Sequence, residues 1–162
     1  MKRNLIKTLG MAGGLAVLIT MGTLNTSMAQ HHGGGRLEGA WNTQVSVIDC
    51  QSGNVIATFA NMPVFAAGGT MTETTSGTAP ALRTSGEGVW HHITGNHYAF
   101  RFKSFTFNTQ SVFTGWMIIQ ADASLDSTGD AYTSSATIEV YDASGVLVGT
   151  GCAESAGTRF EL

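Results

Sequence analysis

The sequence predicts an all-β protein, a single antiparallel up-and-down β-barrel of about eight strands preceded by a signal peptide. Three observations carry this prediction. Apolar and polar residues alternate through Gly86–Asn108, as in an antiparallel sheet with one buried and one solvated face. Turn sequences rich in Gly, Ser, Asn and Asp separate the other candidate strands. The chain has 21 Gly but only two Pro, which suits many strands joined by tight turns.

The N-terminus has the order of features that is typical of a secretory signal peptide. Lys2 and Arg3 precede an apolar run, and the run ends at the small-residue sequence Ser27-Met28-Ala29. A membrane anchor is the alternative, but Gly13-Gly14 interrupts a run that is already short for a span. We therefore expect no membrane span in the mature protein.

The chain is therefore predicted to have three parts. Residues 1–29 form the signal peptide, residues 30–36 a flexible N-terminal segment, and residues 37–162 the barrel domain. The expected location is secreted or periplasmic, by bacterial export through the signal peptide.

Two cysteines, Cys50 and Cys152, occur in this expected exported chain. A disulfide is the default for such a pair, and two free thiols are the alternative. The bond would close a loop of about a hundred residues, for which chain entropy gives a stabilisation of roughly 4–5 kcal/mol.

The clearest hairpin turns at Gly95-Asn96, because Gly accepts positive φ and Asn accepts the left-handed region. A loop symmetric about this dipeptide places six residues on one mostly apolar face, which we expect inside the barrel: Val89, His91, Ile93, Tyr98, Phe100 and Phe102. Trp90, His92 and His97 then face outward. A β-bulge near Lys103-Ser104 would turn Phe105 and Phe107 inward.

The first and last strands test barrel closure. Strand 37–50 carries Trp41 on its inner face and Cys50 on its outer face. In an antiparallel pair the residue numbers of partners sum to a constant, so one register brings Cys50 beside Cys152 and sets Arg159 diagonally over Trp41. A guanidinium over an indole stabilises by about 0.5–2 kcal/mol. We therefore assign Trp41 and Arg159 a structural role.

Gly39-Ala40-Trp41 with Arg159 resembles the Gly-x-Trp and terminal Arg signature of lipocalin-like (calycin) barrels. The chain is also similar to small exported bacterial proteins of unknown function, through the segments MTETT, GEGVWHH and GTGCAESAGTRFEL. The first resemblance implies a barrel that binds a small molecule. The second implies export and assigns no activity.

The candidate ligand-binding residues are His91, Val89, Tyr98, Phe100 and Phe102, with His91 as the one polar group on the inner face. An imidazole titrates near neutrality and can orient a ligand or transfer a proton. The alternative is a core histidine bonded to a neighbouring Thr or a backbone carbonyl.

Other chemistry-bearing residues lack the spacing of a site. Glu73 and Asp122 have no evident partner, and no Gly-x-Ser-x-Gly or phosphate-loop motif occurs. We therefore expect no catalytic residue, no cofactor and no metal site in the barrel. His31-His32 follows the expected cleavage site and could bind Cu(II) or Ni(II), but an unstructured polar tail is the simpler interpretation.

The formal net charge is −3 and no basic cluster occurs, which argues against nucleic acid as a partner. Three functions remain, in this order: binding of a small hydrophobic molecule inside the barrel, a structural or interaction module of the cell envelope with a packed core, and a barrel-type cyclase or isomerase that uses His91 or Glu73. The sequence leaves the oligomeric state open.

Overall fold

A computed structural model describes residues 36–162; the predicted signal peptide and the His31-His32 segment lie outside this range. The strands are β1 (Gly39–Ile48), β2 (Val55–Phe65), β3 (Thr70–Thr75), β4 (Gly86–Thr94), β5 (His97–Phe107), β6 (Phe113–Leu125), β7 (Ala131–Asp142) and β8 (Leu147–Arg159). Within residues 36–162 there is no helix, and so none long and apolar enough to cross a membrane.

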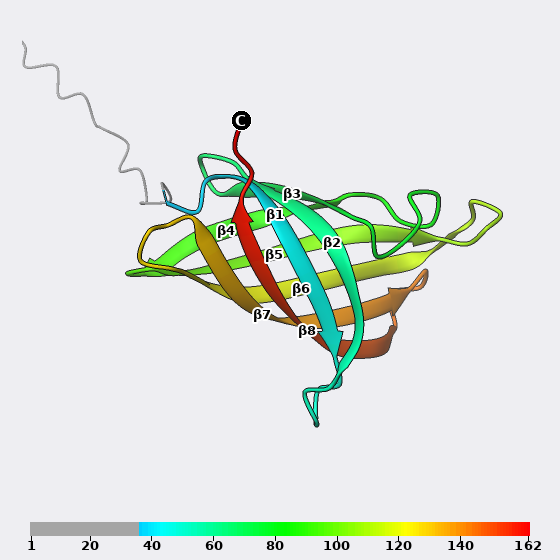
Figure 1. Ribbon diagram of the computed structural model, residues 1–162. Helices are drawn as coiled ribbons and strands as arrows, with labels where there is room; N and C mark the ends of the chain where they lie inside the picture. The colour runs from blue at the N-terminus through cyan, green and yellow to red at the C-terminus, as the bar shows by residue number, and fades with distance from the viewer. Residues whose placement is uncertain (1–35) are drawn as a thin grey trace, which may run out of the picture.

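Each strand pairs antiparallel with the next, and β8 pairs with β1 to close the barrel (Figure 1). The predicted fold class is therefore confirmed. The closing register runs from Trp41 opposite Arg159 to Ile48 opposite Cys152. Trp41 and Arg159 are thus direct partners rather than the diagonal neighbours we expected.

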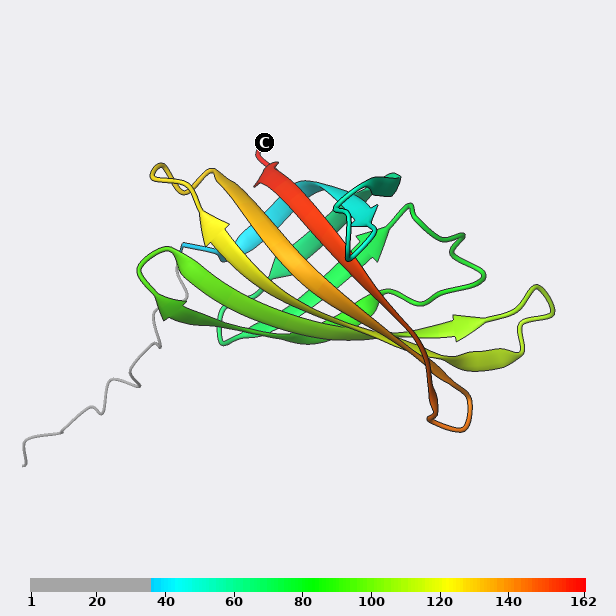
Figure 2. The same cartoon turned by 90° about the horizontal axis from the view of Figure 1, so that it is seen from below.

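The strand connections gather at two ends (Figures 1 and 2). Connections 66–69, 95–96 and 126–130 lie at one end, together with residues 36–38 and 160–162; we call this the closed end. Connections 49–54, 76–85, 108–112 and 143–146 lie at the other end, where the strands spread apart; we call this the open end.

Aromatic side chains fill the closed end. Trp41 is fully buried, and its ring meets Tyr132 edge to face at 5.0 Å between centroids. Phe65 lies against Trp90 at 5.9 Å, and Trp90 lies against Tyr98 at 6.1 Å. Buried aromatic pairs of this geometry stabilise by about 0.5–1.5 kcal/mol beyond their area burial. The core of the barrel therefore lies at one end.

Arg159 holds residues 36–38, which we call the lead-in to β1, across the closed end. Its guanidinium lies 4.4 Å from the centre of the Trp41 ring and donates hydrogen bonds to the backbone carbonyls of Arg36, Glu38 and Gly129. The indole of Trp41 donates to the carbonyl of Leu37 at 3.0 Å. The predicted contact between Trp41 and Arg159 is confirmed, and it joins β1, β8 and the lead-in.

The β4–β5 register differs from our prediction by one residue. Trp90 pairs with Phe100, and an irregularity between His92 and Thr94 shifts the ladder near the turn. Because side chains alternate, this shift moves the β4 residues from Glu87 to His92 to the other face, whereas Thr94 still pairs with His97 as predicted. Trp90 is therefore buried, and its indole donates to the Ala66 carbonyl at 3.0 Å.

The prediction of a β-bulge near Lys103-Ser104 is wrong. The β5–β6 ladder continues without a shift until Thr106, so Ser104 lies inside and is fully buried. Phe105 therefore lies outside, with 45% of its surface exposed.

The predicted disulfide is present between Cys50 and Cys152, with 5.3 Å between their Cα atoms and a sequence separation of 102 residues. Cys50 follows the end of β1, and Cys152 lies in β8 next to the inward-facing Ala153. The bond therefore joins the two strands that close the barrel.

Candidate functional site: an interior cavity

The open half of the barrel is hollow. A cavity of about 320 Å³ begins above the closed-end core and reaches the open end beside Gly77 and Thr78. Its walls are mostly apolar and come from most of the strands: Val45, Val47, Ala57, Phe59, Pro63, Met71, Phe100, Phe102, Met117, Ile119, Ala121, Ala136, Ile138 and Ala153.

The cavity has room because several inward residues of the open half are small. In β8 the inward positions next to Ile138 and Val140 are Gly151 and Gly149. In β2 the inward residue Ala57 stands opposite Val47. Eight-stranded barrels have an interior that side chains can fill or that can hold one small ligand. In this barrel, the closed half is filled and the open half is hollow.

One buried ion pair lies in the wall of the cavity. Glu73 on β3 is 1% exposed and Arg83 in the 76–85 connection is 8% exposed, and the guanidinium donates a hydrogen bond to the carboxylate. An antiparallel bridge between Arg83 and Thr106 holds the arginine against β5. Gly86 stands opposite Glu73, and a Cβ at this glycine would lie 2.5 Å from Glu73 Oε1 and from Phe102. The lack of a side chain at Gly86 therefore makes room for the carboxylate.

The ion pair uses only part of its hydrogen-bonding capacity. Within residues 36–162, no partner reaches Oε2 of Glu73 or Nε of Arg83. The same holds for Oδ1 of Asn61, which also lines the cavity, and for Oγ of Ser104. A buried polar atom without a partner costs about 1–3 kcal/mol, and more when it is charged. Such atoms in a cavity wall are therefore candidates for contact with a ligand.

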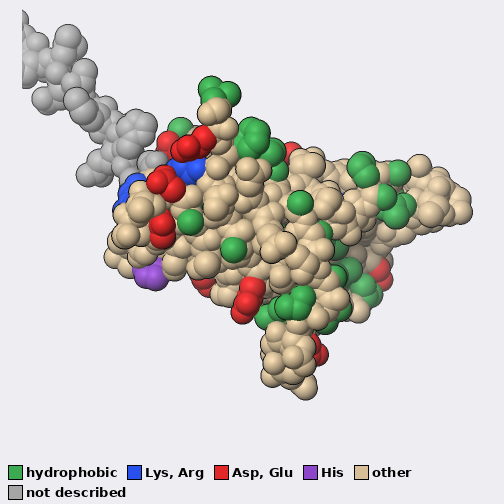
Figure 3. All heavy atoms as spheres, in the orientation of Figure 1, with side chains coloured by type: hydrophobic (Ala, Val, Ile, Leu, Met, Phe, Trp, Pro, Cys, Tyr) green, Lys and Arg blue, Asp and Glu red, His purple; other side chains and the backbone are tan. Residues whose placement is uncertain are grey.

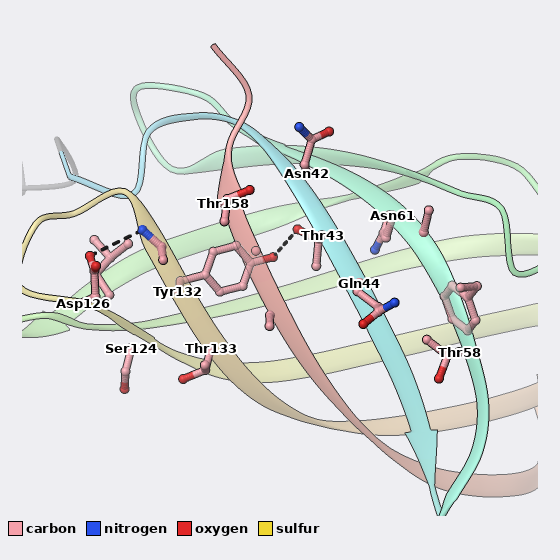
Figure 4. A pocket seen from close by; sticks show the side chains of 16 residues that line it. Asn42, Thr43, Gln44, Thr58, Asn61, Ser124, Asp126, Tyr132, Thr133 and Thr158 are labelled. Atoms are coloured by element: carbon pink, nitrogen blue, oxygen red, sulfur yellow. Dashed lines mark hydrogen bonds between the residues drawn. The ribbon is translucent and has the colours of Figure 1, made fainter.

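Tyr132 forms the floor between the closed-end core and the cavity. Its hydroxyl lies 2.9 Å from Oγ1 of Thr43, and the pair is buried (Figure 4). Burial raises the pKa of Tyr132, and the hydrogen bonds from Thr43 and Ser155 oppose that shift. The hydroxyl therefore stays protonated near neutral pH and presents a neutral polar group.

The structure separates the predicted ligand-binding residues into two groups. Phe100 and Phe102 line the cavity, as expected for inward residues of β5. Tyr98 also faces inward, but it is 2% exposed and belongs to the closed-end core.

Val89 and His91 do not face inward as predicted. Both lie outside the barrel, because the shifted β4 register turns Gly88, Trp90 and His92 inward instead. Val89 is 58% exposed, and His91 is exposed as well. His91 therefore cannot orient a ligand or transfer a proton inside the cavity. Among the other histidines, His97 lies outside as predicted, whereas His92 lies beside Tyr98 at the closed end.

From the sequence, Glu73 has no evident partner and Arg83 has no recognisable role. The alternation of Met71, Glu73 and Thr75 within β3 was the available signal, since it places the carboxylate on the same face as a buried methionine. Arg83 lies in an irregular connection, where no periodicity marks the inward residues.

A second, more open hollow of about 790 Å³ includes residues of β1, β2, β7 and β8 and the end of β6 (Figure 4). Its polar side chains include Asn42, Gln44, Thr58, Thr133 and Thr158. These residues alternate with inward neighbours along their strands and so face outward. The hollow lacks an enclosing wall and is the weaker candidate.

Exposed apolar residues ring the open end. They lie at, or one residue before, the starts of β2, β6 and β8. They are Val55 and Ile56; Val112 and Phe113; and Val146, Leu147 and Val148. Charged side chains gather instead near the closed end, around Arg36, Glu38, Asp130 and Arg159 (Figure 3). The mouth of the cavity is therefore the more apolar end.

Within residues 36–162, no group of three or more His, Cys, Asp or Glu side chains is placed to hold a metal ion. Comparisons with protein-family models, with curated protein sequences and with solved structures found no match to this chain.

Proposed function

We propose that this protein is an exported lipocalin-like barrel that binds one small apolar molecule in its interior. The observation that carries the proposal is the apolar cavity of about 320 Å³ that opens at one end. An engineered apolar cavity of about 150 Å³ binds benzene, so the cavity suits a ligand of roughly twice that size. Ligand sites in proteins are typically concave, mostly apolar and furnished with a few polar groups.

The apolar mouth supports this proposal. Val55, Val112 and Val148 mark three sides of the open end and are 57–62% exposed. An apolar molecule of low solubility reaches a cavity more easily across an apolar rim than across a charged one. The disulfide between β1 and β8 is compatible with a location outside the cytoplasm.

A direct test uses naphthalene as an uncharged probe and a variant that fills the cavity. Ala136 lines the cavity and Ala156 faces outward on β8, so Ala136→Leu and Ala156→Leu add the same atoms inside and outside. We expect naphthalene to bind the wild type and the Ala156→Leu variant with equal affinity, and the Ala136→Leu variant at least tenfold more weakly. Calorimetric titration measures the affinity, and native mass spectrometry of freshly isolated protein reports a ligand already bound. Failure of the wild type to bind the probe would overturn the proposal.

A second candidate is an interaction module, because the exposed apolar ring at the open end also suits a protein contact. This candidate predicts self-association that Val112→Ser with Phe113→Ser abolishes, as measured by sedimentation velocity. A monomer at all concentrations would contradict this second candidate.

A further inference from the structure

The buried pair of Glu73 and Arg83 carries more information about the ligand than the apolar walls do. Both side chains line the cavity, and both are more than nine-tenths buried. One contact joins them, between Nη2 of Arg83 and Oε1 of Glu73. Two fully buried atoms of the pair, the acceptor Oε2 of Glu73 and the donor Nε of Arg83, have no partner among residues 36–162. Both atoms have almost no accessible surface, so a ligand in the cavity reaches this acceptor and this donor when the two side chains rotate slightly toward it.

The charge of the pair limits which ligands can use these atoms. Glu73 and Arg83 neutralise each other, and Asn61, which also has an unpartnered atom, is uncharged. Glu154 is the other charged residue along the cavity, but it is exposed and follows the inward-facing Ala153, so its carboxylate points outward. A ligand carboxylate would lie near the Glu73 carboxylate and share one guanidinium with it. A ligand ammonium would lie near Arg83 in the same way. In either case an ion would leave water for a site with no free opposite charge, which is strongly unfavourable.

A neutral hydroxyl avoids this cost. It has one donor hydrogen and two acceptor lone pairs, so it can donate to Oε2 of Glu73 and accept from Nε–H of Arg83. Hydrogen bonds to ionised groups are shorter and about twice as strong as those between neutral groups. The difference in affinity between a ligand with this hydroxyl and one without it is large, because the ligand without it leaves the buried polar groups unpartnered.

From this chemistry we infer that the cavity selects an uncharged alcohol, with the hydroxyl on Glu73 and Arg83 and the apolar body toward the mouth. The inference rests on the proposed function and adds the chemical class of the ligand. The apolar walls along Val47 and Ile138 hold the body of the molecule.

The test compares three probes that share an eight-carbon chain: 1-octanol, octanoate and octylammonium, each titrated into the full-length mature protein at pH 7 with naphthalene as the apolar reference. We expect 1-octanol to bind at least tenfold more tightly than either ion. Equal binding of 1-octanol and octanoate would overturn the inference while leaving the proposed function intact, provided that naphthalene binds. Failure of naphthalene and of all three chains would overturn both.

Single substitutions then change the charge of the site in opposite directions. Glu73→Gln leaves Arg83 without its counter-ion, and we expect octanoate to become the preferred probe. Arg83→Gln leaves Glu73 alone, and octylammonium becomes preferred. A pair that only anchors the 76–85 connection would lower the stability of both variants without reversing the order of the probes, which would overturn the inference.

A double variant keeps the test decisive when a single unpaired charge prevents folding. Glu73→Gln with Arg83→Gln removes both charges and keeps polar groups of similar shape. We expect it to keep the preference for 1-octanol over both ions and to bind 1-octanol several-fold more weakly than the wild type, because its hydrogen bonds are no longer to ions. Unchanged affinity for 1-octanol in the double variant would contradict a contact between the hydroxyl and the pair. Ser135→Ala, on the outer face of β7, is the matched control and should change neither affinity nor order.

Discussion

The two ends of the barrel are built from the same strands but have opposite interiors. At the closed end, β1 presents Trp41 to the inside, and at the open end the same face of the same strand presents Val45 and Val47. β7 presents Tyr132 to the closed-end core and, further along the same face, lines the cavity with Ala136 and Ile138. Alternation decides which residues face inward, whereas the size of those residues decides whether the interior is filled. A binding site can therefore arise in a barrel without a change in its topology.

The two ends also differ in how they are held together. The closed end relies on packed rings and on Arg159, whose guanidinium links residues of the lead-in and the 126–130 connection. Toward the open end, the covalent bond from Cys50 to Cys152 joins the strands β1 and β8. We expect packing variants to have their largest effects at the closed end, and loss of the disulfide to act near the cavity.

The largest effect is expected for removal of the disulfide by Cys50→Ser with Cys152→Ser. The bond closes a loop of 102 residues, for which chain entropy gives about 4–5 kcal/mol of stability. Chemical denaturation followed by tryptophan fluorescence measures the change in unfolding free energy. A loss below about 1 kcal/mol would show that the hydrogen bonds between β1 and β8 hold the barrel closed without help from the disulfide.

Trp41→Ala tests the packed end. The indole is fully buried against Tyr132, so its removal should lower the unfolding free energy by about 3–5 kcal/mol. Val47→Ala is the comparison at the open end, where a smaller side chain is half-buried and borders the cavity. We expect a loss below about 1.5 kcal/mol there, because Val47 is already partly exposed. Similar losses at both positions, in the same denaturation assay, would contradict the contrast between the two ends.

Arg159→Lys should give a smaller loss. Lysine keeps the positive charge near Trp41 but cannot reach the carbonyls of Glu38 and Gly129 together, which the planar guanidinium does at 2.8 and 2.9 Å. We expect the unfolding free energy to fall by about 1.5–3 kcal/mol, the range for a hydrogen bond to a charged group. Hydrogen exchange should rise in residues 36–40 and stay unchanged in the β7–β8 hairpin at the open end.

Sequence patterns predicted the barrel well because apolar and polar residues alternate along its strands. Two features of the sequence also indicated that the first and last strands pair. The disulfide and the contact of Arg159 with Trp41 both follow from one pairing of β1 with β8. The cavity was harder to predict. A one-residue irregularity between His92 and Thr94 exchanged the faces of β4, and nothing in the alternating pattern marks where such a shift occurs.

The polar group of the cavity was missed for a related reason. Glu73 lies on a regular strand, but its partner Arg83 comes from the 76–85 connection, where residue order does not determine which side chains point inward. Pairing between a strand and an irregular segment depends on tertiary packing. The volume of the cavity likewise depends on how inward residues of several strands meet, such as Ala57, Ala136 and Gly151.

The smallest expected effect concerns the turns, which are alike at the two ends. Asp126 at the closed end accepts hydrogen bonds from the hydroxyl of Thr128 and from backbone amides, including that of Gly129 at 2.7 Å. Asp142 at the open end accepts them in the same way from Ser144 and from the amide of Val146. The hydroxyl and amide hydrogen bonds hold the pKa of both carboxyls below that of an ordinary aspartate, and desolvation opposes them.

Each carboxylate therefore contributes stability that is fully present above the pKa of an unfolded aspartate, about 3.9, and that is lost as the pH falls through the lower folded pKa. Thr128→Val removes the largest cause at Asp126 and should raise the pKa of Asp126 alone, leaving that of Asp142 unchanged. Carbon-detected NMR titration of the two carboxyl groups measures both values in one experiment, with Thr133→Val on the outer face of β7 as the control. A parallel rise at Asp142 would mean that the two ends are coupled through the strands, whereas a rise confined to Asp126 would show that each turn forms by itself.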